Sequence, residues 1–132
     1  MAFVVDASVV AAWFLPDEDS AVADEALARL KTQDALAPDL LLHELRNILL
    51  SAERRKRISA DDIFAILMRF SSLPLTLSPS TDHVSIIRLA QKHALSAYDA
   101  AYLSLAIAHN APLATHDRKL AAAAKMESMA FV

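Results

Sequence analysis

The sequence contains no glycine and no cysteine, and each absence removes a class of chemistry. Phosphate-binding loops of the P-loop and dinucleotide-binding kinds need glycine, because their backbone must approach the phosphates closely. We therefore expect no nucleotide cofactor. Without cysteine there is no disulfide framework and no thiolate metal site, which suits a reducing cytoplasm.

A large charge of one sign is also missing. The net charge of −3 gives no general attraction to nucleic acid, so any such binding must be local or mediated by a metal. No apolar run approaches the roughly 20 residues of a membrane span, and "MAFVVDASVV" lacks the positive start of a signal peptide. We expect a soluble protein that does not contact a membrane. Its 132 residues are enough for one domain, 1–132, with one core.

Short apolar runs alternate with helical patterns along the chain. We expect strands at 2–5, 35–37, 75–77 and 112–115, with 129–132 as a final strand, and helices at 7–14, 19–31, 40–57, 59–70, 81–93, 96–109 and from about 117. Asn110, followed by Pro112, takes the place of a glycine cap. The alternation predicts an α/β fold with a parallel sheet covered on both faces. In such folds ligands bind outside the carboxyl ends of the strands.

Four acidic residues occupy positions where function is expected in such a fold. Asp6 directly follows the first strand, and Asp117 follows the strand at 112–115 after one histidine. Glu44 lies inside a long helix, with Asn47 on the same flank. Asp99 lies in the first turn of a helix that has no obvious polar face, which indicates burial and a need for a partner.

Each acid also has a plain structural interpretation. Asp6 and Asp117 are candidate N-caps, and Asp99 forms a capping box with Ser96 in the [ST]-x-x-[DE] pattern. However, two carboxylates about 4 Å apart repel by about 4 kcal/mol at an effective dielectric near 20, so a group of them needs protons or cations. Oxygen ligands of this kind suit Mg²⁺ or Mn²⁺. We therefore predict one metal site made by all four acids.

Several other polar residues are weaker candidates. Ser8 and Thr115 flank the acids and are suited either to hydrogen-bond a ligand or to cap helices. His116 adjoins Asp117, and its role stays open. The basic run "ERRKR" at 53–57 resembles a phosphate-binding patch, although cations at a helix C-terminus also complement the helix dipole.

Three segments together resemble the PIN-domain ribonucleases, most closely the VapC-type toxins of type II toxin–antitoxin pairs. They are "FVVDASVVAAWFLPDEDS", "APDLLLHELRNILL" and "LSAYDAAYLSLAIAHNAPLATHDRKL", which cover nearly the whole chain in order. By this resemblance the family's metal-binding acids, which are also its catalytic residues, are matched by Asp6, Glu44, Asp99 and Asp117. Its supporting polar positions are matched by Ser8, Asn47 and Thr115.

The resemblance implies a three-layer α/β/α fold and a Mg²⁺-dependent endoribonuclease of the cytoplasm, in which Mn²⁺ can substitute. It further implies a structured RNA substrate such as tRNA or rRNA, a homodimer and a VapB-type antitoxin. The apolar fraction of 55 % and the short helix with Trp13 and Phe14 agree with such protein interfaces. We expect RNA phosphates to be bound by Arg46, Arg54, Arg55 and Arg118.

Three other classes of function remain open from the residues alone. A Mg²⁺ phosphatase of the haloacid dehalogenase type needs D-x-D after the first strand, where this chain has Ser8 in the third place. A receiver-like phosphoacceptor module needs adjacent acids after the first strand, where this chain has only Asp6. A non-catalytic RNA- or protein-binding module would not need four convergent acids.

Overall fold

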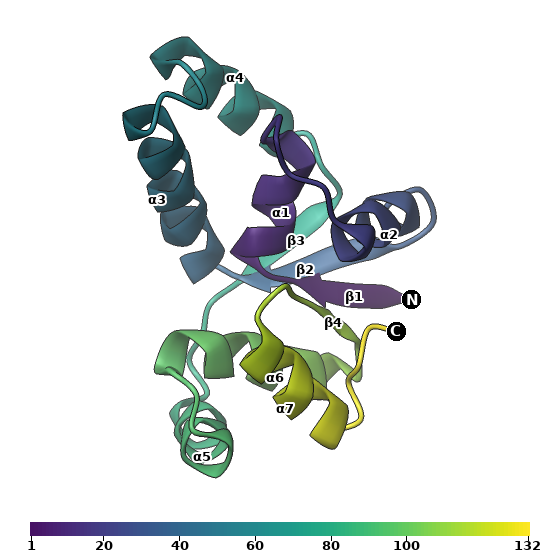
Figure 1. Cartoon of the computed structure of the whole chain (residues 1–132). Coiled ribbons are helices and arrows are strands. Elements are labelled where there is room, and N and C mark those ends of the chain that lie inside the picture. Colours follow the sequence, from purple (N-terminus) through teal and green to yellow (C-terminus); the bar gives the residue numbers. More distant parts are fainter.

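The computed structural model describes all 132 residues and has a four-stranded parallel sheet between two groups of helices (Figure 1). Helices α1 to α4 cover one side of the sheet and α5 to α7 the other, which confirms the predicted three-layer α/β fold. No helix combines the length and the apolar character needed to cross a membrane. The elements in chain order are β1 (Ala2–Val5), α1 (Ala7–Phe14), α2 (Ala21–Arg29), β2 (Asp34–Pro38), α3 (Leu40–Arg54), α4 (Ala60–Phe70), β3 (Leu75–Ser78), α5 (His83–His93), α6 (Ala97–His109), β4 (Leu113–Ala114) and α7 (Arg118–Met126).

The strand order places two chain connections of opposite direction side by side. The order is β3-β2-β1-β4, and every neighbouring pair is parallel. From β1 the chain passes through α1 and α2 on one face, whereas it reaches β4 through α5 and α6 on the other. Ligands bind in parallel sheets at such a reversal, beyond the carboxyl ends of the strands. Val5 pairs with Ala114, so Asp6 and Thr115 leave the sheet next to each other.

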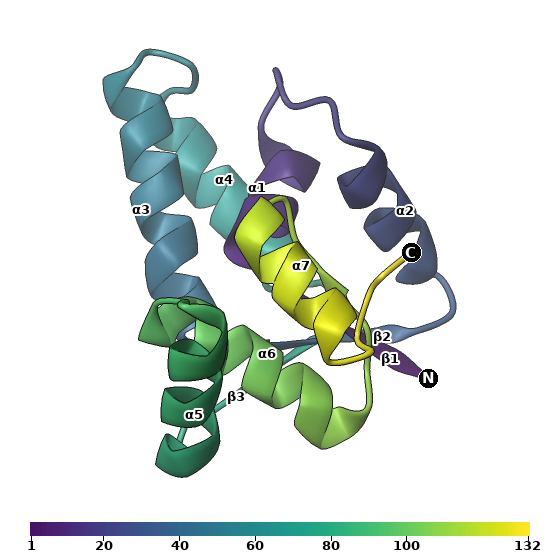
Figure 2. The ribbon, with the colours of Figure 1, turned by 60° about the horizontal axis from the view of Figure 1, so that its bottom comes forward.

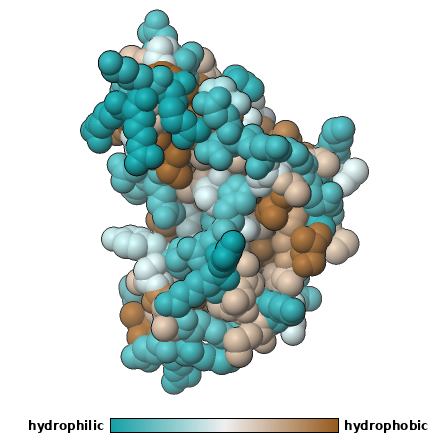
Figure 3. Space-filling model, viewed as in Figure 1, coloured by the Kyte–Doolittle hydropathy of each residue, from teal (hydrophilic) through white to brown (hydrophobic).

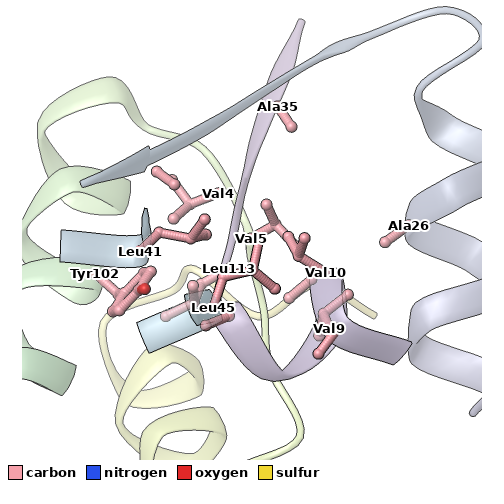
Figure 4. Packing of buried hydrophobic residues seen from close by; sticks show 14 of the residues in the cluster. Val4, Val5, Val9, Val10, Ala26, Ala35, Leu41, Leu45, Tyr102 and Leu113 are labelled. Carbon is pink, nitrogen blue, oxygen red and sulfur yellow. The ribbon is translucent and has the colours of Figure 1, made fainter. Parts of the chain in front are cut away.

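The core holds α3 firmly against the sheet. Val4 and Val5 of β1 are fully buried, as are Leu41 and Leu45 of α3. Figure 4 shows these side chains close together, with the ring of Tyr102 beside Leu41. Each apolar side chain buried in this way contributes about 1.5–3 kcal/mol. This packing fixes the helix turn that carries Glu44.

The chain ends its helices without glycine. Four residues have a left-handed backbone, with φ between 48° and 63°: Lys56, Ala94, Asn110 and Ser128. Asn110 is the C-cap of α6, as expected, and its amide donates to the carbonyls of Ala106 and Ile107. Asparagine tolerates this conformation through local hydrogen bonds, whereas alanine has no such compensation.

Two sequence-based expectations were wrong in detail. The segment 129–132 adds no strand, since only an isolated bridge joins Ala130 to Leu113. The start of α6 is open to solvent, and Tyr98 is 66 % exposed, because the core covers only the later turns of this helix. Trp13 is half-buried and its indole N–H donates to the Ala23 carbonyl at 2.8 Å, while its part in a protein interface stays a prediction.

Candidate active site

A cleft of about 540 Å³ opens at the carboxyl edge of β1 and β4, and all four predicted acids line it. No lysine or arginine side chain lines it. The acids come from four separate parts of the chain: the end of β1, the second turn of α3, the first turn of α6 and the start of α7. The lining residues are Asp6, Ala7, Ser8, Glu44, Asn47, Ile48, Asp99, Tyr102, His116 and Asp117.

Asp6 is the most tightly held of the acids. Asp6 is 8 % exposed, and its carboxylate accepts hydrogen bonds from the Ser8 hydroxyl at 2.6 Å and from the Val9 amide at 3.1 Å. The Thr115 hydroxyl donates to its second oxygen. The predicted N-cap role is therefore real, and the same bonds fix the direction of a carboxylate that borders the cleft. Thr115 itself lies behind Asp6 and does not line the cleft.

Glu44 has a partner that the sequence did not reveal. The hydroxyl of Tyr102 donates to Glu44 Oε1 at 2.5 Å, and Tyr102 is only 1 % exposed. Burial raises the pKa of Glu44, the Tyr102 hydrogen bond opposes this, and the charges of Asp6 and Asp99 add to the rise. Burial and the bond to Glu44 also raise the pKa of Tyr102, which keeps its proton on the phenol.

Tyr102 was counted in the sequence as one more apolar residue of its helix. The spacing of Tyr102 from Asp99 would have indicated that Tyr102 belongs to the site, since residues three apart lie on the same face of a helix. A buried tyrosine hydroxyl also needs a hydrogen-bond partner, which an acidic cleft supplies.

Asp99 is not the acid of a capping box. The Ser96 hydroxyl accepts from the Asp99 amide at 3.1 Å, but no return bond runs from the Ser96 amide to the carboxylate of Asp99. In the box at the start of α4, Ser59 and Asp62 make both bonds. Burial raises the pKa of Asp99, the charges of Asp117 and Asp6 raise it further, and the Ser96 hydroxyl opposes them. Capping therefore does not explain this carboxylate.

His116 and Asp117 form the rim on the β4 side. One oxygen of Asp117 accepts from the Leu120 amide at 2.8 Å, so this acid caps α7 as predicted. The ring of His116 is hydrogen-bonded through Nε2 to the hydroxyl of Ser20, the N-cap of α2. This bond holds the imidazole at the cleft and joins the start of α2 to it.

The predicted RNA-binding arginines lie outside the cleft. Arg54, Arg55 and Arg118 are exposed and make no ion pair, but none of them lines the cleft. Arg46 lies on the other side of α3, where it lines an apolar groove with Leu67 and Phe70 of α4. Helix periodicity explains this, since Arg46 is about 200° around the axis from Glu44.

The donor set suits a divalent metal in its chemistry. All the charged groups are carboxylates, and the pKa values of Glu44 and Asp99 are raised first by burial and further by the charges of the neighbouring acids. No three histidine, aspartate or glutamate side chains converge closely enough to hold an ion by themselves. Mg²⁺ usually keeps several waters and uses one or two carboxylates, so it does not require such a group of three.

Fold and cleft together define an α/β domain with an acidic site at the carboxyl edge of a parallel sheet. Comparison with known proteins then names the family. The model of the PIN domain family matches residues 3–126, and the chain belongs to this family. It is 33 % identical over 125 residues to ribonuclease VapC3 of Pyrobaculum aerophilum, covering 92 % of this chain and 93 % of the relative.

A solved structure agrees with the family assignment. The crystal structure of PAE2754 from Pyrobaculum aerophilum matches with a TM-score of 0.64 and 27 % identity. The match covers 93 % of this chain and 87 % of the other. The resemblance inferred from the sequence motifs is thus confirmed at the level of the family.

Proposed function

We propose that the protein is a metal-dependent endoribonuclease that acts as a toxin. The observation that carries this proposal is the convergence of four carboxylates from four chain segments on one cleft without a lysine or arginine to balance them. The similarity to a VapC ribonuclease supports RNA as the substrate. The proposal treats residues 1–132 as one functional domain that works in the cytoplasm, where RNA is available.

Asp6, Glu44, Asp99 and Asp117 would hold Mg²⁺, or Mn²⁺ in its place, together with water. When bound, the ion would lower the pKa of a water to supply the nucleophile and would offset the charge that develops on the leaving 3′ oxygen. The expected products carry 5′-phosphate and 3′-hydroxyl ends.

The neighbouring residues have the task of orientation. Ser8 and Thr115 fix the carboxylate of Asp6, and Tyr102 fixes that of Glu44. Because these donors are already in place, little reorganisation is needed when substrate enters the cleft. Asn47 presents a neutral amide at the same wall, suited to hydrogen-bond a phosphate or sugar oxygen.

The proposal includes protein partners. By its likeness to VapC ribonucleases we infer a VapB-type antitoxin and a homodimer. Large apolar side chains that the fold leaves exposed support such contacts, among them Phe64 and Met68 of α4.

The proposal is tested with protein freed of any antitoxin and incubated with total cellular RNA. We expect cleavage with Mg²⁺ and none with EDTA. Asp6→Asn and Glu44→Gln should each lower the rate at least about 100-fold, since each removes a charge from the site. Asp62→Asn, which alters an acid of α4 remote from the cleft, is the control and should cleave as the wild type does. Cleavage that persists in EDTA or in Asp6→Asn would overturn the metal mechanism.

A further inference from the structure

The wall of the cleft continues along α3 toward a pair of free arginines. Ser51 and Arg55 follow Glu44 after seven and eleven residues, which brings them within about 20° of the same line along the helix. Arg54 follows Asn47 by seven residues and therefore lies on nearly the same line along the helix as Asn47. The run from Glu44 to Arg55 is about 16 Å long at the helical rise of 1.5 Å per residue.

Only part of the basic run is available to a ligand. Arg57 is occupied within the chain, because its guanidinium lies 3.4 Å from Glu18 and 3.9 Å from Asp17. Arg54 and Arg55 are exposed and make no ion pair. They lie at the outer end of α3, which Figure 3 shows covered by hydrophilic side chains. Arg57 therefore joins the α3–α4 turn to the α1–α2 loop, whereas Arg54 and Arg55 remain free.

The opposite wall of the cleft also continues into exposed basic residues. Arg118 and Lys119 begin α7 directly after Asp117, and both are exposed without an ion pair. Figures 1 and 2 both show the start of α7 close to the start of α1. The carboxylates in the cleft repel a polyanion, and the net charge of −3 gives no general attraction. When no metal is bound, cations beyond the cleft must therefore supply the binding energy for the RNA backbone.

We propose that one RNA strand leaves the cleft along the Glu44–Ser51–Arg55 line of α3, and that Arg54 and Arg55 bind its backbone phosphates. This proposal rests on the proposed function and adds a direction and a length to it. A span of about 16 Å corresponds to at most about five nucleotides of stacked strand, and to fewer if the strand is extended. The side chains contact phosphates and not base edges, so they position the RNA without reading its sequence.

The test measures binding of a fluorescently labelled single-stranded RNA of about 12 nucleotides over a series of salt concentrations in EDTA. Each phosphate contact to a single strand contributes about 0.7 to the slope of log K against log salt, or about fivefold in affinity at about 0.1 M salt. We expect Arg54→Ala/Arg55→Ala to lower the slope by about 1.4 and the affinity about 25-fold.

The control variant removes the same amount of positive charge at positions away from the proposed RNA path. Lys31→Ala/Arg88→Ala removes two exposed cations, one just after α2 and one on α5, and should bind RNA as the wild type does. Thermal melts establish that both variants are folded.

Three outcomes overturn the proposal. Equal losses in the two double variants would mean that only total charge matters. Unchanged RNA binding by Arg54→Ala/Arg55→Ala would mean that these arginines bind an acidic protein partner and not RNA. If the wild type cleaves RNA but does not bind it in EDTA, the acidic cleft alone binds the substrate. A wild type that neither binds nor cleaves RNA contradicts the proposed function itself.

Discussion

At the residue scale, the carboxyl group of Glu44 lies in a position that disfavours its charge. Burial raises its pKa, with Asp6 and Asp99 adding to the effect against the Tyr102 bond. An acid whose pKa is raised by folding stabilises the protein below its unfolded value of 4.5. That contribution is lost as the pH rises through the folded pKa.

We therefore expect Glu44→Gln to gain in stability relative to the wild type as the pH rises from about 4 to about 8, with EDTA present. The glutamine is neutral throughout and keeps an oxygen that accepts from the Tyr102 hydroxyl. Urea unfolding at a series of pH values measures the difference. A difference that is constant with pH, or that falls as the pH rises, would contradict the pKa shift of Glu44.

At the scale of single elements, the lack of glycine has a measurable cost at the end of α5. Ala94 is the C-cap there, with φ 53° and ψ 44°, and it is exposed. An alanine in this conformation is strained by about 1–2 kcal/mol, and a glycine would not be. The greater freedom of glycine in the unfolded chain cancels about half of this gain in stability.

Ala94→Gly should consequently stabilise the protein by about 1 kcal/mol and raise Tm by about 3–5 °C. Ala65→Gly, at an exposed position inside α4, is the matched control and should destabilise by about 1 kcal/mol. Differential scanning calorimetry measures both. If the two substitutions shift Tm in the same direction, the left-handed backbone of Ala94 is not strained.

Elements were predictable from the sequence where local rules decide them. β1 was predictable because four apolar residues, Ala2–Val5, precede Asp6, and α1 was predictable because Pro16 ends it soon after Phe14. Tertiary packing decided the rest. The Tyr102–Glu44 bond joins α6 to α3 across 58 residues. The spacing of Tyr102 from Asp99 places both residues on one face of α6, but no local pattern predicts Glu44 as the partner of Tyr102. The ion pairs of Arg57 with the α1–α2 loop were hidden for the same reason.

At the scale of the whole molecule, the strand order brings the acids to one cleft. The sequence predicted parallel strands and a site at their carboxyl ends, but not that β4 pairs with β1. This pairing sets Thr115 against Asp6 and Asp117 beside both. Strand order depends on contacts between distant segments. Asp6, Asp99 and Asp117 are recognisable because each follows a strand or lies at the start of a helix, whereas Glu44, inside α3, is recognisable only from its place beside the apolar stripe of that helix.

The four acids should act as one site for a divalent cation, and thermal melts of wild type and Asp99→Asn with EDTA and with Mg²⁺ measure this. In EDTA, Asp99→Asn should be as stable as the wild type or more so, because burial and the charges of Asp117 and Asp6 disfavour the carboxylate. At Mg²⁺ about 100 times its Kd, the wild type should gain about 2.7 kcal/mol and Asp99→Asn distinctly less. Asp62→Asn, in a complete capping box, should lose stability in both conditions and keep the full response to Mg²⁺. A wild type that gains nothing from Mg²⁺, or an Asp99→Asn variant that gains as much as the wild type, would contradict the account.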